Sequence, residues 1–214
     1  MDVVLEQAVQ ARAWVEQLWP QQVAAFGTVQ IVIATTGAQF AALRGGAPGT
    51  ADVAASTTAE GTVILSETAL QLLTAQGRRV VLAHELTHVV LKQTQRVGLP
   101  PWIVEGSAEY TAYRWAGLSL ARACPTLRAQ VHSGDIPSLP PTKDLFSGSS
   151  RQSAYQQAHA YMSFLIARFG LAAWKRFVIS VDGAAPGAFA KSFAGAAPAE
   201  LQTAYSSYLR KVMG

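Results

Sequence analysis

The pattern of hydrophobic and polar positions predicts a small sheet in the first part of the chain and helices after it. Residues 2–19 carry apolar side chains at helical spacing, and Pro20 ends this helix. Its apolar side is formed by Val4, Leu5, Ala8, Val15, Leu18 and Trp19. Runs rich in β-branched residues then predict strands over residues 28–34, 53–56 and 62–66.

Short elements connect these strands to the rest of the chain. A hairpin turn is predicted at residues 58–61, between the second and third strands. Short helices are expected around Phe40 and Leu43 and over residues 67–75, and Gly77 separates the latter from the next helix. These elements predict one small sheet that precedes a long apolar helix.

The long apolar helix covers residues 79–91. Apolar residues occupy almost its whole circumference, which is typical of a buried helix. His84, Glu85 and His88 are nevertheless part of it. Because a buried polar side chain costs free energy unless it is paired, these three residues need a chemical reason for their presence.

The HExxH spacing of His84, Glu85 and His88 supplies such a reason. Two histidines four residues apart project from one side of a helix and suit two adjacent corners of a zinc tetrahedron. Glu85 cannot point the same way, but it can reach a water on the metal and act as general base. The alternative is a pair of core histidines satisfied by hydrogen bonds. With 4 histidines and 13 acidic residues in 214, however, the pattern rarely arises by chance.

A second helix, which begins after a Gly/Pro-rich turn at residues 98–101, offers a third ligand. Glu105 lies in its first turns, and two histidines with one carboxylate would leave the fourth zinc position open for water, as catalysis requires. Glu109 follows one turn later on the same face. We expect it to accept a hydrogen bond from the free ring nitrogen of a ligand histidine, the alternative being a surface carboxylate.

Composition narrows the possible classes of protein. Cys124 is the only cysteine, which excludes a cluster of thiolate zinc ligands within one chain. Half of the residues are hydrophobic and 14% are charged, as in a compact globular protein. The net charge of +4 comes without runs of basic residues, so nucleic-acid binding is not expected. No apolar run approaches the roughly 18 residues of a membrane span, and no leader peptide is recognised.

The two motifs together resemble the gluzincin zinc metallopeptidases, and most closely their small peptidase MA-like families. They are His84-Glu-Leu-Thr-His88 and, after sixteen intervening residues, Glu105 within Trp102-x-x-Glu-Gly-x-Ala-Glu-Tyr110. The resemblance implies a zincin-like α+β fold and one Zn²⁺ per chain, held by His84, His88 and Glu105. It implies Glu85 as catalytic base, a peptide or protein substrate, and a secreted or cell-envelope location.

Other zincin branches fit less well. The metzincin pattern requires glycine and histidine where this chain has Leu91 and Thr94. The aminopeptidase branch carries a Gly-x-Met-Glu-Asn motif that this chain lacks, so its specificity is not expected here.

The C-terminal half is predicted to be helical apart from one long loop. Helices are expected over residues 118–132 and 153–169, and the loop at residues 133–150 could cover a cleft. Tyr155 and His159 share one stripe of the second of these helices. The resemblance to a Tyr-rich gluzincin helix makes Tyr155 the first candidate for oxyanion stabilisation and His159 the second; the alternative is a structural tyrosine.

Three final helices are expected to form a cap without chemistry. Their ranges are residues 171–181, 186–194 and 198–213. Their predicted core side chains are Phe189, Phe193, Tyr205, Tyr208 and Leu209.

Taken as a whole, the sequence predicts one domain, residues 1–214, with a lobe of sheet and metal helix (1–95) and a helical lobe (96–214). The expected reaction is zinc-dependent hydrolysis of a peptide bond, with an extended substrate along an edge strand that contains Val63, Ile64 and Leu65. Three alternatives stay open: a zinc hydrolase with a non-peptide substrate, a peptide-binding pseudo-enzyme, and a structural site closed by a further histidine such as His132 or His159.

Overall fold

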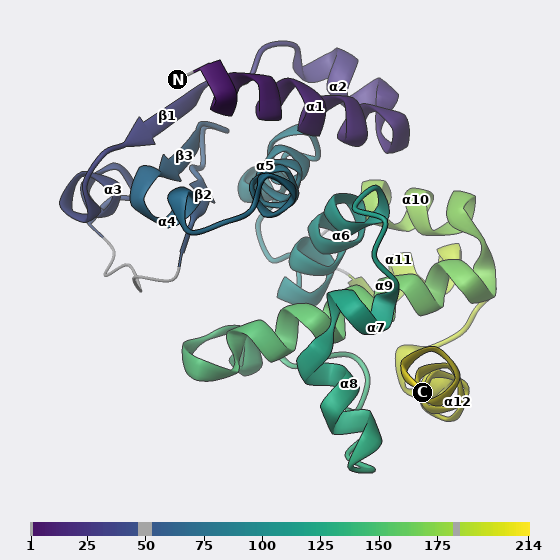
Figure 1. Ribbon diagram of the computed structural model, residues 1–214. Coiled ribbons are helices and arrows are strands. Elements are labelled where there is room, and N and C mark those ends of the chain that lie inside the picture. Colours follow the sequence, from purple (N-terminus) through teal and green to yellow (C-terminus); the bar gives the residue numbers. More distant parts are fainter. Residues whose placement is uncertain (1, 47–52, 182–184) are drawn as a thin grey trace. The chain divides into compact units, whose positions relative to one another are not determined.

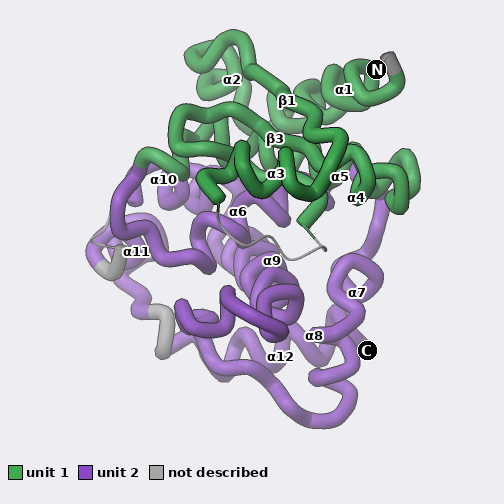
Figure 2. Tube along the Cα trace, turned by 90° about the vertical axis from the view of Figure 1, so that its left-hand side faces the viewer, with its two compact units in different colours: residues 1–95 green, residues 96–214 purple. Residues whose placement is uncertain are grey.

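The computed structural model describes residues 2–46, 53–181 and 185–214. The chain forms two compact units, residues 1–95 and 96–214 (Figure 2). Helices dominate both, and the first contains a sheet of three strands (Figure 1). The described part of the chain is therefore of mixed α and β structure and mostly helical, which confirms the α+β class expected from the sequence.

The first unit is built around two packed helices. Helix α1 (Asp2–Leu18) packs across α5 (Ala75–Val90), the helix that carries the HExxH residues (Figure 1). The side of α1 that is buried contains Ala8, Ala11, Val15 and Leu18. Leu5, which we predicted on this side, is 64% exposed. Val4 lies one turn before Ala8 on the buried side. Leu5 is the next residue, about 100° around the helix from Val4, and therefore faces away from that side.

Several predicted boundaries in this unit shift. Pro20 does not only end the first helix: it begins a second, α2 (Pro20–Phe26), because proline fits the first turn of a helix. Helix α5 begins at Ala75 and includes Gly77, which was expected to precede it. Thr74 caps this start, since its hydroxyl accepts a 3.0 Å hydrogen bond from the backbone amide of Gly77.

The sheet contains β1 (Ile31–Ala34), β2 (Ala55–Thr57) and β3 (Val63–Ser66) in the order β1-β3-β2. Two short helices, α3 (Gly37–Leu43) and α4 (Glu67–Gln71), lie at its connections. β2 and β3 form the predicted hairpin, whose turn closes with a 2.9 Å hydrogen bond from Thr58 N to Thr62 O.

The prediction that the third strand is an edge strand is wrong. β3 pairs in parallel with β1 and antiparallel with β2, so it is the central strand. Its residues Val63, Ile64 and Leu65 are buried, and their backbone groups face a neighbouring strand on both sides. An extended substrate cannot pair with them. Sequence order did not reveal this, because the hairpin inserts β3 between two earlier strands.

The second unit is organised by α6 (Pro101–Arg114) and α9 (Arg151–Phe169), which pack along each other. Gly106 makes their close approach possible. A Cβ atom at this position would lie 2.9 Å from the carbonyl oxygen of Ala158 and 3.0 Å from Cγ of Met162. A distance of 2.9 Å to a backbone atom is too short for any side chain, so glycine is required here.

The remaining helices of the second unit enclose a largely aromatic core. They are α7 (Leu120–Ala123), α8 (Pro125–His132), α10 (Leu171–Ser180), α11 (Ala185–Ser192) and α12 (Gln202–Met213). The largest side chains buried among them and α9 are Trp174, Tyr161, Tyr205, Phe177, Phe189 and Phe193. Of the predicted core residues in the C-terminal helices, all are buried except Tyr208, which is half-buried.

The predicted loop at residues 133–150 contains two short 3₁₀ turns, η2 (Lys143–Phe146) and η3 (Gly148–Ser150), and η2 packs against α6 and α9. Two more 3₁₀ turns are η1 (Gln93–Gln95) in the first unit and η4 (Pro198–Leu201) before α12. Within the ranges that the structure describes, no helix is both long enough and apolar enough to cross a membrane.

The contact at Gly106 leads to a prediction about stability. Gly106→Ala should lower the free energy of unfolding by about 2 kcal/mol, because α6 and α9 must separate to admit the methyl group. Gly187→Ala is the matched control: it is also helical, and a Cβ there meets nothing within 4 Å. Denaturant unfolding of both variants checks this. Equal midpoints for the two variants would contradict the close packing.

Candidate metal centre

The centre begins with α5, whose residues from Leu82 to Val90 are all buried. His84, Glu85 and His88 have exposed fractions of 9%, 8% and 7%. The apolar neighbours on α5 explain this burial, since they place the helix in the interior on every side. The three polar side chains are thus held in a position where each needs a partner.

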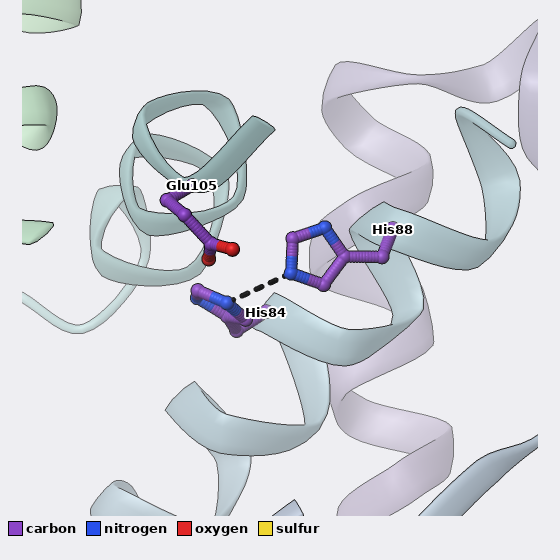
Figure 3. A group of neighbouring side chains, drawn as sticks. All are labelled: His84, His88 and Glu105. Atoms are coloured by element: carbon purple, nitrogen blue, oxygen red, sulfur yellow. Dashed lines mark hydrogen bonds between the residues drawn. The ribbon is translucent and has the colours of Figure 1, made fainter. Parts of the chain in front are cut away.

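The two histidines converge through the same ring atom. Nε2 of His84 and Nε2 of His88 lie 2.9 Å apart, with the ring planes at 83° (Figure 3). Two imidazoles on a tetrahedral zinc, with Zn–N of about 2.0–2.1 Å, have their nitrogens roughly 3.3 Å apart. The observed distance between the two Nε2 atoms is therefore only a few tenths of an ångström shorter than the distance expected on zinc.

Gln93 fixes the orientation and the tautomer of His88. Its Oε1 lies 2.7 Å from Nδ1 of His88, and an amide oxygen can only accept a hydrogen bond. Nδ1 therefore carries the proton, which leaves the lone pair of Nε2 for a metal. Lys92 adopts a φ of 51°, turning the chain after α5 so that Gln93 returns to the helix. Sequence analysis missed Gln93, because a lysine at positive φ is not foreseeable from residue type.

Thr57 is a second residue that sequence analysis missed. Its Oγ1 lies 2.6 Å from Oε2 of Glu85 and 3.3 Å from the backbone oxygen of the same residue. Thr57 is the last residue of β2, which packs against α5. The two residues are 28 positions apart in sequence, so only the packing of β2 on the helix reveals the contact.

Glu105, the third predicted ligand, lies on α6 in the second unit. Helix α6 begins with Pro101 after Pro100, in the position where proline suits a first helical turn. The hydroxyl of Tyr155, on α9, hydrogen-bonds the Glu105 carboxylate. Burial, the charge of Glu105 and this hydrogen bond together raise the pKa of Tyr155 far above its usual value. Tyr155 is thus a neutral donor to the carboxylate at neutral pH, and its role toward an oxyanion stays a prediction.

His159 and Cys124 are buried next to each other in the second unit, and the half-buried Tyr113 and Glu109 complete a polar cluster with them. The ring of His159 stacks on Tyr113 at 5.4 Å, and its Nδ1 lies 3.7 Å from Sγ of Cys124. Burial lowers the pKa of His159 to about 4, although the nearby charge of Glu109 acts in the opposite direction. His159 is therefore neutral at pH 7. The expected contact of Glu109 with a ligand histidine stays a prediction.

His84, His88 and Glu105, the ligands predicted from the sequence, are a group of side chains that could hold a metal ion. One possible ligand atom from each lies within 4.8 Å of the others (Figure 3). No other group of three such side chains occurs among residues 2–46, 53–181 and 185–214. His132 and His159 are not members; Nε2 of His132 donates instead to the carbonyl oxygen of Met213 at 3.0 Å.

The donor atoms fit a catalytic zinc ion. Two imidazole nitrogens and one carboxylate oxygen are a common set of three protein ligands at catalytic zinc, and they leave a fourth position for water. The same donors also bind other divalent transition metals, so the set by itself does not select the ion.

Comparison of the chain with protein-family models, curated proteins and solved structures gave no match. The chemistry of the centre is therefore inferred from its donor atoms and from the contacts of Glu85, His88 and Glu105.

The contact between Gln93 and His88 leads to a prediction about metal affinity. Gln93→Ala removes the acceptor that fixes the His88 tautomer, and zinc affinity should fall by roughly 10–100-fold. Gln95→Ala, an exposed position of the same 3₁₀ turn, should leave the affinity unchanged. Competition with a chromophoric chelator measures both. The assignment of Gln93 fails if the two variants bind zinc equally.

Proposed function

We propose that this protein is a zincin-like metallopeptidase that hydrolyses peptide bonds with a metal-activated water. The proposal is supported above all by one observation: a glutamate, Glu85, is held by Thr57 next to two histidines whose Nε2 atoms converge. A site that only stored a metal would not require a buried carboxylate beside the ligands. The small sheet, the HExxH helix and the helical C-terminal half are consistent with a zincin-like fold.

In the proposed reaction His84, His88 and Glu105 hold the metal, and a zinc ion bound there would lower the pKa of a water to about 7 and polarise the scissile carbonyl. Glu85 takes a proton from the water while the oxygen of the water attacks the carbonyl carbon. Glu85 then delivers this proton to the nitrogen of the leaving amine as the C–N bond breaks. Tyr155 is the proposed donor to the oxyanion, a role that requires its hydroxyl to turn from Glu105 toward the substrate.

β2 replaces β3 as the proposed docking strand for an extended peptide. Ala54 and Thr58 direct backbone groups toward β3, since Ala54 O accepts from Ser66 N and Thr58 N donates to Thr62 O. Because these directions alternate along a strand, Ala55 and Thr57 direct their backbone groups away from β3. Among the described strands, β2 is at an edge, and it packs on α5 beside Glu85. Such an edge suits a peptide backbone better than a small non-peptide ester.

A hydrolase of non-peptide substrates is the second candidate, since metal-activated water attacks any suitable carbonyl. A peptide-binding pseudo-enzyme is less consistent with the site, because Glu85 is present and hydrogen-bonded.

The proposed mechanism predicts different effects for substitutions of Glu85, the proposed base, and Glu105, a proposed metal ligand. Glu85→Gln should retain one zinc per chain and lose roughly two to four orders of magnitude in peptide hydrolysis, because an amide cannot take the proton. Glu105→Ala should lose zinc. Elemental analysis and cleavage of a mixed peptide library, with chelator and after zinc is restored, measure both effects. Undiminished hydrolysis by the Glu85→Gln variant would exclude this mechanism, and cleavage of esters alone would favour the second candidate.

The proposed docking strand predicts a periodic response in the substrate. A series of substrate peptides can be made in which one backbone nitrogen at a time is methylated. KM should rise by roughly 3–10-fold when the methyl group is at alternate residues, because only every second amide of an extended peptide faces β2. The intervening residues, methylated in the same peptide, are the internal control. Steady-state kinetics over the series tests this, and a response without the two-residue period would place the substrate elsewhere.

A further inference from the structure

We infer that Thr57 is a positioning residue for the general base: its hydroxyl holds the Glu85 carboxylate in the orientation that proton transfer requires. This inference rests on the proposed function and deepens it. The observation behind it is the 2.6 Å separation of Thr57 Oγ1 and Glu85 Oε2. A distance of about 2.5–2.7 Å is that of a hydroxyl that donates to a charged carboxylate.

The direction of this hydrogen bond follows from the chemistry of its atoms. A threonine hydroxyl has one proton, and two acceptors lie nearby: Oε2 of Glu85 at 2.6 Å and its backbone oxygen at 3.3 Å. The shorter bond to the charged acceptor takes the proton. Oε2 is then the anchored oxygen of the carboxylate, and Oε1 is the one that receives the proton of the attacking water.

Thr57 can fix Glu85 because Thr57 itself is fixed. It pairs with Val63 in the hairpin register, and the hydrogen bond from Thr58 N to Thr62 O closes the hairpin directly after it. Its side chain is branched at Cβ, which restricts rotation about χ1. Glu85 is only 8% exposed, so little water competes for the hydroxyl. A glutamate side chain has three rotatable bonds, and holding Oε2 in place reduces the freedom that they allow the carboxylate.

The same residue connects the base to the proposed docking strand. The backbone groups of Thr57 point to the open side of β2, where an extended peptide would pair, while its hydroxyl holds Glu85. A peptide paired with β2 would therefore order the strand end that orients the base. Loss of the hydroxyl should lower kcat and leave KM almost unchanged, because the backbone groups that bind substrate remain.

The experiment compares three variants of the full chain loaded with zinc. Thr57→Val keeps the shape of the side chain and removes the donor; kcat should fall roughly 10–100-fold, the usual effect of a hydrogen bond to a charged group. Thr57→Ser restores the donor and should recover most of the loss. Thr58→Val is the matched control: its hydroxyl accepts from Thr62 N at 3.2 Å and does not contact Glu85, so its kcat should equal that of the parent chain.

A cycle with Glu85→Gln separates positioning from a general structural effect. If Thr57 acts through Glu85, adding Thr57→Val to the Glu85→Gln variant should lower kcat little further. The inference is overturned by a parental kcat in the folded, zinc-loaded Thr57→Val variant, by a failure of serine to restore kcat, or by an equal loss in both backgrounds. A parent chain that binds zinc and hydrolyses no peptide would instead overturn the proposed function, and this inference with it.

Discussion

The burial of ionisable groups on one apolar helix is the constraint on which the first unit depends. Helix α5 carries His84, Glu85 and His88 where water has little access, and an unpaired polar group there would cost several kcal/mol. Two residues supply hydrogen-bond partners that reduce this cost. Gln93, which follows the end of the helix, bonds His88, and Thr57 of β2 bonds Glu85. The partners that make burial tolerable also orient the side chains, so stability and chemistry depend on the same contacts.

In the second unit, the corresponding constraint is the close packing of α6 and α9. Gly106 lets the two helices approach, and the residue before it, Glu105, faces the hydroxyl of Tyr155 on the other helix. The two neighbouring residues thus make separate contacts with α9: Glu105 accepts the hydrogen bond of Tyr155, and Gly106 lets the helices lie close enough for that contact. A larger residue at position 106 would disturb the Glu105 carboxylate, although residue 106 is not itself one of the predicted metal ligands.

The polar cluster of the second unit, which contains Glu109 of α6 and His159 of α9, is of a different kind. His159 is neutral because burial lowers its pKa to about 4, and burial, with the charge of Glu109, raises the pKa of the Cys124 thiol. Neither group is suited to proton transfer or nucleophilic attack near neutral pH. Cys124 donates instead to the backbone oxygen of Gln156, and the ring of His159 stacks on Tyr113. These surroundings favour Tyr155 over His159 as the proposed catalytic group.

The sequence by itself predicted most of the helices and strands, and the candidate ligands His84, His88 and Glu105, because each depends on local periodicity or on a motif. The spacing of His84 and His88 on one helix fixes their common direction whatever surrounds them. Only the tertiary structure decided which strand lies at the edge of the sheet, since strand order depends on how the hairpin inserts beside β1. It alone revealed Thr57 and Gln93, because their roles arise from packing and from one residue at positive φ, and neither leaves a pattern in the sequence.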